Sequence, residues 1–403
     1  MASVNHTAEP TLSQSRRSVL NITTRCRKVH DMFLAFREMR RAKVRFSLLI
    51  VAVSLLMFLI LFQQALQNSL ISAFIGGLKS QTAPVLVYTT DAQRTAFASV
   101  ISPDLERRIA GVSGIAAHAR IGISSFTVTS NRVESSATLF GFENQRLGGP
   151  GTLSAGRLPA VAGEAVGSSA DFVIGQQVEV VSTGDADSVG FTVVGLAEDA
   201  QLLVTPTLFV DYAAYESAVK AANPDARAVL PNLVAVRPTA GLSATELATR
   251  INTASADADA LTKSEAAAQT PGVAQVRQSF QIIFALYGLV VPLITGLFFL
   301  IITLQKAGSL TLLRAIGARS GVLIRSLLVQ VGVVIGGGLA LGVALFAPLS
   351  QATLGTLTLS FDVGAVAFWS GLLLGLGLLS ALVAARRVLA IDPIEATMSG
   401  SSR

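Results

Sequence analysis

The residue types that perform most enzyme chemistry are scarce in this chain. It has three histidines, His6, His30 and His118, and one cysteine, Cys26. A Ser-His-Asp or Cys-His arrangement needs a histidine beside its nucleophile. Only His118 lies outside the basic N-terminal segment, and we expect it to be a surface or packing residue. The sequence also lacks CxxC, HExxH and acidic calcium-loop patterns. It therefore predicts a non-catalytic chain that holds no cofactor or metal of its own.

Three arginines lie in one short stretch between two apolar runs, GSLTLLRAIGARSGVLIRSLLVQ (308–330). A short amphipathic helix is predicted over 306–316, and Gly317 suits the left-handed position that follows a helix. The side chains that could meet a partner there are Leu310, Leu313, Arg314, Ile316, Gly317 and Arg319. From composition alone, these arginines equally fit the simpler interpretation that they anchor lipid head groups.

The C-terminal tail carries a second short-helix signal. In RRVLAIDPIEA (386–396), Asp392 is an N-cap, Pro393 occupies the first helical position and Glu395 stands three residues after the cap. Ordered short helices at a membrane face could form a docking surface, to which Arg40 and Arg41 before the first apolar run would add.

The elements that must position these residues are apolar helices. The chain has 403 residues, of which 51% are hydrophobic and 14% charged. About 20 apolar residues cross a bilayer. Four runs without Asp, Glu, Lys or Arg are long enough: 46–66, 280–304, 327–347 and 363–385. We therefore predict four transmembrane helices.

Charge asymmetry predicts the orientation of these helices. Residues 1–45 hold ten Lys/Arg and three acids, and 305–326 holds four Lys/Arg and no acid. The block 70–277 holds 14 basic and 19 acidic residues. Because cytoplasmic loops are rich in Lys/Arg, both termini and the 305–326 loop are expected in the cytoplasm. The net charge of +6 then reflects topology, and no nucleic-acid partner is expected.

The block between the first two apolar runs is predicted to be an α+β extracytoplasmic domain. Alternating patterns predict strands over 83–89, 124–130, 134–142, 176–182, 190–197, 205–211 and 232–238, and capped helices are predicted over 102–112, 211–222 and 243–254. The first helix is expected to run from Val44 to Ile75 and to stop at Gly76–Gly77. A matching extension is expected before the second run, over 270–283.

The glycines of the last two runs form two GxxxG patterns, Gly338–Gly342 and Gly371–Gly375. These patterns allow close helix contact, either within one subunit or at a dimer seam.

The predicted architecture is a polytopic α-helical membrane protein with four transmembrane helices and a large α+β extracytoplasmic domain between the first and second. The predicted parts are 1–35 (basic, disordered, cytoplasmic), 36–78 (amphipathic approach and first helix), 79–270 (extracytoplasmic domain), 271–305 (second helix), 306–320 (cytoplasmic helix), 321–348 (third helix), 349–362 (short outer loop), 363–385 (fourth helix) and 386–403 (cytoplasmic tail).

Several segments resemble the FtsX/MacB-like (DevC-type) ABC transporter permease family. LLRAIGARSGVLIRSLLVQ (312–330) is similar to the family's cytoplasmic loop, and FREMRRAKVRFSLLI (36–50) to its basic first-span approach. GRLPAVAGEAVGSSADFVIGQQVEV (156–180) and the segment 191–219 resemble parts of its outer domain. ARRVLAIDPIEA (385–396) resembles its ending.

The resemblance implies a membrane subunit that passes motion from a separate ABC ATPase to the extracytoplasmic domain. It implies two ATPase copies, a homodimer of this chain, surrounding membrane lipids, and ATP and Mg bound by the partner. A hydrophobic or amphiphilic cargo would meet the seam between the first two helices, where Met57, Phe62 and Tyr287 are candidate contacts. A regulator of an extracytoplasmic cell-wall hydrolase, a haem exporter and a lipoprotein-release permease remain open alternatives, as does an extracytoplasmic adaptor.

Overall fold

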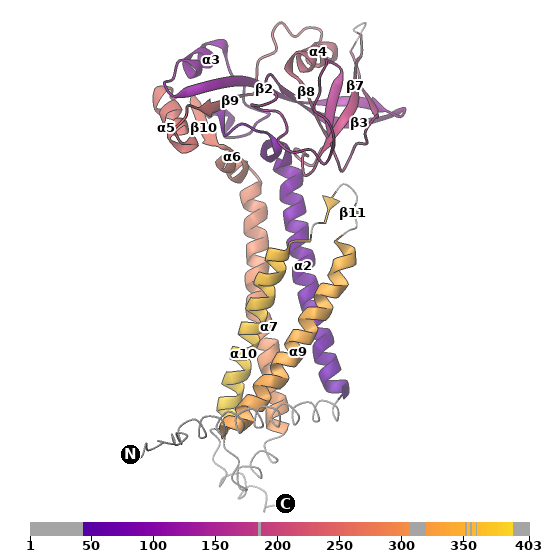
Figure 1. Cartoon of the computed structure of the whole chain (residues 1–403), viewed down its shortest axis with the longest axis vertical. Helices are drawn as coiled ribbons and strands as arrows, with labels where there is room; N and C mark the ends of the chain where they lie inside the picture. The colour runs from indigo at the N-terminus through magenta and orange to yellow at the C-terminus, as the bar shows by residue number, and fades with distance from the viewer. Residues whose placement is uncertain are drawn as a thin grey trace, which may run out of the picture. The chain divides into compact units, whose positions relative to one another are not determined.

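The computed structural model of the chain describes residues 43–183, 187–305, 320–350, 353–354, 357–359 and 361–389. The chain divides into two compact units (Figure 1). The apolar unit contains the described residues up to Phe62, those from Ile283 to Pro348 and those from Asp362 onward. The β-rich unit contains Gln63–Ile282 and Leu349–Phe361.

The apolar unit is built from four long helices: α2 (Lys43–Ser80), α7 (Val273–Gln305), α9 (Ser320–Leu349) and α10 (Val363–Leu389). Each is long and apolar enough to cross a membrane. They coincide with the four apolar runs, because such runs satisfy all backbone hydrogen bonds internally only as helices. Two of them, α2 and α7, also supply residues to the β-rich unit.

The first glycine pair of α9 packs against α2 of the same chain. A Cβ on Gly338 would lie 2.6 Å from the Val53 Cβ, and one on Gly342 would lie 2.7 Å from the Ser54 carbonyl oxygen. This GxxxG pattern therefore serves close packing within one chain. The second pair, Gly371 and Gly375, is exposed on α10, and an added Cβ there would meet no atom within 4 Å.

A hydroxyl contact joins α7 to α10. Ser380 Oγ donates a hydrogen bond of 2.9 Å to the Pro292 carbonyl oxygen. The same hydroxyl occupies the space beside Gly296, where an added Cβ would lie 2.1 Å from it. Further along the pair, the rings of Phe284 and Trp369 lie 5.1 Å apart, centroid to centroid. Pro292 itself has no backbone N–H to donate within α7.

The β-rich unit is organised around one ten-stranded sheet, in the order β10-β1-β9-β2-β3-β8-β5-β7-β4, with β6 pairing β2 and β7. The strands are β1 (Val85–Thr89), β2 (Ile115–Ser130), β3 (Val133–Phe142), β4 (Ala155–Gly156), β5 (Glu164–Ser168), β6 (Gln177–Val180), β7 (Val189–Ala197), β8 (Thr207–Asp211), β9 (Leu233–Pro238) and β10 (Ala258–Thr262). A small hairpin, β11 (Thr353–Leu354) and β12 (Leu357–Thr358), lies in the α9–α10 connection.

Six of these strands close on themselves. β2 pairs with β3, β3 with β8, β8 with β5, β5 with β7, β7 with β6, and β6 with β2 again. The closed ring leaves β10, β1 and β9 as an antiparallel extension on the first half of β2. The sixteen residues of β2 are therefore shared between both halves.

The short helices of this unit are α3 (Pro103–Ala110), α4 (Tyr212–Ala222), α5 (Ala244–Ala254), α6 (Lys263–Gln269) and the 3₁₀ turn η1 (Thr90–Ala92). α3 and α5 cover the β10-β1-β9 extension, and α4 packs on the closed ring (Figure 1). Tyr215 of α4 lies over Gly122 and Gly141, where an added Cβ would come within 2.1 and 2.5 Å of it.

The structure confirms the seven expected strands and three expected helices of this unit, and it adds several that the pattern did not predict. Those additions are β4, β5, β10, the hairpin β11–β12, α6, the turn η1 and the first half of β2. The expected stop at Gly76–Gly77 is wrong, because α2 continues to Ser80. Those glycines have a different role, described below.

Candidate functional site at the first stalk helix

Gly76 and Gly77 let another segment approach the backbone of α2. A Cβ on Gly76 would lie 2.0 Å from the Asp199 carbonyl oxygen, which is far inside contact distance. A Cβ on Gly77 would lie 3.3 Å from the Leu202 Cβ, a tight but tolerable contact. The glycines therefore mark where the loop between β7 and β8 docks on the helix, rather than where the helix ends.

The docked loop takes over hydrogen bonds of the helix. In a regular α-helix the Gly77 N–H would donate to the Ala73 carbonyl. Here the Gly77 N–H donates to the Gln201 carbonyl at 2.8 Å, and the Ala73 carbonyl accepts from the Val204 N–H at 2.8 Å. The Leu203 N–H adds a third bond to the Phe74 carbonyl at 3.0 Å. We call this set of contacts between 199–204 and α2 the dock.

The loop adopts a costly conformation to reach the helix. Asp199, Leu203 and Val204 have positive φ angles of 47°, 52° and 60°. Such angles disfavour residues with a side chain, most of all a β-branched one such as Val204. Backbone strain of this kind persists only where surrounding contacts fix it, and the three interelement hydrogen bonds of the dock are those contacts.

The end of α2 is held by further backbone bonds. The Gly151 N–H donates to the Ser80 carbonyl at 2.7 Å, and the Thr82 N–H donates to the Gly149 carbonyl at 3.0 Å. The start of α7 packs on the same helix through an apolar cluster that includes Ile71, Ile75 and Val273. Both long helices are thus built into the β-rich unit.

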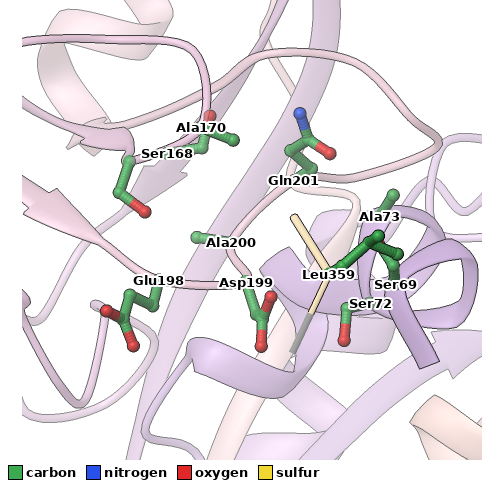
Figure 2. Close-up of a pocket in the computed structure, with 11 residues that line it drawn as sticks. Ser69, Ser72, Ala73, Ser168, Ala170, Glu198, Asp199, Ala200, Gln201 and Leu359 are labelled. Carbon is green, nitrogen blue, oxygen red and sulfur yellow. The ribbon is translucent and has the colours of Figure 1, made fainter. Parts of the chain in front are cut away.

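A polar pocket of about 250 Å³ lies beside the dock. Figure 2 shows hydroxyls of α2 and carboxylates of the β7–β8 loop around one space, with Leu359 of the α9–α10 connection at its side. Its polar lining residues are Ser69, Ser72, Ser168, Ser169, Glu198, Asp199 and Gln201.

The hydrogen bonds of this pocket connect residues of the β-rich unit to one another. The Ser168 hydroxyl donates to the Asp171 carboxylate, which also accepts from Gln201 Nε2 at 2.8 and 2.9 Å. The pocket lining contains no histidine that could act as a base toward these serines. Among the described residues there is also no group of three His, Cys, Asp or Glu placed to hold a metal ion.

Several charged side chains of the β-rich unit have shifted pKa values, and Glu164 and Lys263 are two of them. The Arg157 guanidinium, hydrogen-bonded to Glu164, is the main reason that the pKa of this carboxyl falls to about 2, and the Ala160 N–H adds to the effect. Burial lowers the pKa of Lys263, whose Nζ donates to the Gln81 carbonyl at 2.6 Å.

The predicted cargo residues make three separate contacts. Met57 is fully buried, and its side chain packs beside Gly342 of α9. Phe62 stacks on Phe58 at 6.3 Å between ring centroids. Tyr287 lies 6.4 Å from Phe284 of the same helix. None of these contacts joins one of the three residues to another, and their contact with a cargo stays a prediction.

The other predicted contact residues lie outside the described residues. They are Arg40, Arg41, Leu310, Leu313, Arg314, Ile316, Gly317, Arg319, Asp392, Pro393 and Glu395. His118 lies exposed on β2. The dock itself was not predicted, although two adjacent glycines inside an otherwise continuous helical pattern were the available signal.

Comparison with solved structures finds likenesses to extracytoplasmic domains of permeases. The periplasmic region of MacB from Actinobacillus actinomycetemcomitans matches at 15% identity and a TM-score of 0.32, over 47% of this chain and 92% of that domain. The extracellular domain of the noncanonic ABC-type transporter YknZ from Gram-positive bacteria matches at 14% identity and a TM-score of 0.30, over 45% of this chain and all of that domain.

A domain of a putative permease protein from Porphyromonas gingivalis matches at 15% identity and a TM-score of 0.28, over 42% of this chain and 81% of that domain. No protein-family model and no curated protein sequence matches the chain. Identities and scores this low carry no argument about function, which has to come from the chain's own residues.

Proposed function

We propose that this chain is the membrane subunit of an ATP-driven exporter of the FtsX/MacB-like kind, moved by a separate ABC ATPase. The observation that carries the proposal is the path of the chain. One apolar helix, a large β-rich unit and three more apolar helices follow in order, and α2 and α7 each supply residues to both units. The resemblance of 312–330 to the family's cytoplasmic loop supports an ABC ATPase as the partner that supplies the energy.

The dock supplies the connection that such a machine requires. Three backbone hydrogen bonds and the close approach at Gly76 join α2 to the loop between β7 and β8. A shift of this part of α2 would therefore move β7 and β8 of the closed ring through the loop that connects them. Interfaces of this kind switch between discrete arrangements, because packed cores do not deform continuously.

In the proposed cycle, two ATPase copies bind ATP and Mg and close against each other. Their closure displaces the cytoplasmic loop around Leu313 and Arg314 in each copy of a homodimer. The displacement travels along α2 and α7 and changes the β-rich units, which expel a hydrophobic or amphiphilic cargo. Coupling of this kind needs only that the loop contacts the ATPase differently in its two nucleotide states.

The proposal places the chain in a bacterial cytoplasmic membrane, with both termini on the ATPase side. It assigns the chain itself no catalytic step, since hydrolysis belongs to the partner. Whether the β-rich unit also engages an adaptor or a wall hydrolase is an outcome of the test below.

The test is co-purification of the tagged full-length chain from its native membranes, followed by an ATPase assay on the eluate. We expect an ABC ATPase to co-elute with the wild type and to be lost with Leu313→Asp/Arg314→Glu. The matched control is Arg227→Glu/Leu230→Asp, the same changes at two exposed residues of the β-rich unit, which should retain the ATPase. A wild-type eluate without an ATPase would contradict the proposal.

A further inference from the structure

A second groove of the β-rich unit is lined by cations from three different helices. Lys79 comes from the last turn of α2, Lys263 from the start of α6 and Arg277 from α7. The groove holds about 580 Å³ and is open to solvent. No Asp or Glu is among its lining residues.

These cations are not neutralised by the protein. Within the part of the chain that the structure describes, none of the three forms an ion pair, and Lys263 Nζ donates only to the Gln81 carbonyl. Two acids that adjoin lining residues of the groove in the sequence, Glu246 and Glu265, take part in helix caps. Glu246 accepts from Ser243 at 2.9 and 3.0 Å, and Glu265 from Thr262 at 2.8 and 2.9 Å.

Another groove of this unit is also lined by three cations, but two of them form ion pairs. It lies between α3 and α5 and is lined by Arg107, Arg108 and Arg250. Arg107 pairs with Asp104 on its own helix, and Arg108 pairs with Asp257 at 2.7 Å. Most of its positive charge is therefore already matched, and it provides a natural control with the same number of cations.

The groove lined by Lys79, Lys263 and Arg277 also has apolar lining residues. They are Ile75, Pro84, Ala244, Ala267 and Ala268, and three hydroxyl residues, Thr245, Thr262 and Ser264, complete the lining. Lys and Arg commonly lay their aliphatic stems along apolar surface while the charged end stays in water. A ligand that satisfies both features has an anionic head and an apolar body. A free anion would leave the apolar lining uncovered, and a neutral lipid would leave the three cations unpaired.

We infer that this groove binds an anionic amphiphile, with its phosphate or carboxylate head between Lys79, Lys263 and Arg277 and its acyl chain along the alanines of α6. Taking this ligand as the exported cargo rests on the proposed function, whereas binding itself does not. Because the groove joins the end of α2 to the start of α7, a bound ligand contacts both helices that are proposed to move.

The test is a binding titration of the full-length chain in phosphatidylcholine nanodiscs without an ATPase, read by native mass spectrometry. The probes are dioctanoyl phosphatidylglycerol, dioctanoyl phosphatidylcholine and inorganic phosphate. We expect the phosphatidylglycerol probe alone to bind, with an affinity that falls as salt screens the charges. Preferential binding of phosphatidylcholine, or equal binding of free phosphate, would overturn the inference.

Charge-removing variants locate the site. Lys79→Gln/Lys263→Gln/Arg277→Gln should weaken phosphatidylglycerol binding about tenfold, as expected for three charge contacts in an open groove. Arg107→Gln/Arg108→Gln/Arg250→Gln should leave it unchanged. Because Lys263 also bonds the Gln81 carbonyl, Lys79→Gln/Arg277→Gln serves as a second variant that keeps this bond. Equal loss in the control triple, or no loss in either groove variant, would contradict the assignment.

The co-purification and the binding titration together distinguish the proposed exporter function from the proposed binding of an anionic amphiphile. An ABC ATPase that co-purifies with a chain that binds no anionic amphiphile would leave the exporter standing and remove its assigned cargo. Lipid binding by a chain with no ATPase partner would do the reverse.

Discussion

The dock predicts opposite outcomes for two adjacent glycines. Replacing Gly76 with Ala places a Cβ 2.0 Å from the Asp199 carbonyl oxygen, so the loop must retreat. Replacing Gly77 with Ala places it 3.3 Å from the Leu202 Cβ, which a small shift of that side chain relieves. Both changes give α2 a better helix former, so they differ only in what the new methyl group meets.

The expected loss of docking free energy follows from the hydrogen bonds that break when the loop moves away from α2. The three backbone hydrogen bonds of the dock contribute about 1 kcal/mol each, or about 3 kcal/mol together. Exchanging a helical glycine for alanine stabilises α2 by about 1 kcal/mol, whether the loop is docked or not. We therefore expect Gly76→Ala to weaken the dock by about 3 kcal/mol, while Gly77→Ala leaves it intact and stabilises α2 slightly.

Hydrogen exchange measures this directly. The amides of Leu203 and Val204 are protected by the Phe74 and Ala73 carbonyls, so exchange of these two amides, resolved within a peptide covering 199–206, reports the dock. A loss of about 3 kcal/mol corresponds to about 150-fold faster exchange. The full-length protein in nanodiscs is the sample, with peptides from the closed ring as the internal reference.

Two results would refute this reasoning. Wild-type protection in Gly76→Ala would mean that the loop does not approach the helix at this point. Equal deprotection in both variants would mean that the glycines act through the flexibility of the helix and not through the close contact.

Three further predictions concern packing and charge. Gly296→Ala should lower the unfolding temperature in detergent, because its Cβ would lie 2.1 Å from a serine hydroxyl of α10, whereas Gly288→Ala, which meets nothing within 4 Å, should not. Asn232→Ala should cost about 1–3 kcal/mol of stability in a denaturant titration, since it strands a buried N–H and a buried carbonyl. Because the pKa of Glu164 is lower in the folded protein than in the unfolded chain, its ionised carboxylate stabilises the fold at pH values above the unfolded pKa. This stabilisation is lost as the pH falls toward 2. Arg157→Gln should therefore reduce the fall in unfolding temperature between pH 5 and pH 2 in thermal scans.

The sequence predicted the elements of this protein better than their connections. Four apolar runs without charge dictate helices, and alternating strands such as 190–197 bury every second residue. The strand β5, with the sequence EAVGS, has no such alternation because four of its five residues are buried. The Thr262–Glu265 capping box of α6 was a readable signal that went unused.

The candidate sites depended on contacts that no local pattern carries. The closure of the ring depends on the pairing of Val128 of β2 with Val180 of β6, which are far apart in sequence. The dock pairs α2 with residues more than a hundred positions away, and the cationic groove collects Lys79, Lys263 and Arg277 from separate helices. Such pairings follow from the tertiary fold, and single glycines or lysines in a sequence do not specify them.

The most direct test of the account measures whether ATP on one side of the membrane moves the β-rich unit on the other. A spin label at Val133→Cys, an exposed position at the β2–β3 turn, in a Cys26→Ser background gives one label per chain. Distances between the labels of two copies are measured with the co-purified ATPase, nucleotide-free and trapped with ATP and vanadate. The account predicts a defined intersubunit distance that shifts on trapping and stays fixed in Leu313→Asp/Arg314→Glu. A distance distribution that is identical in both states of the wild type, with trapping verified, would contradict it.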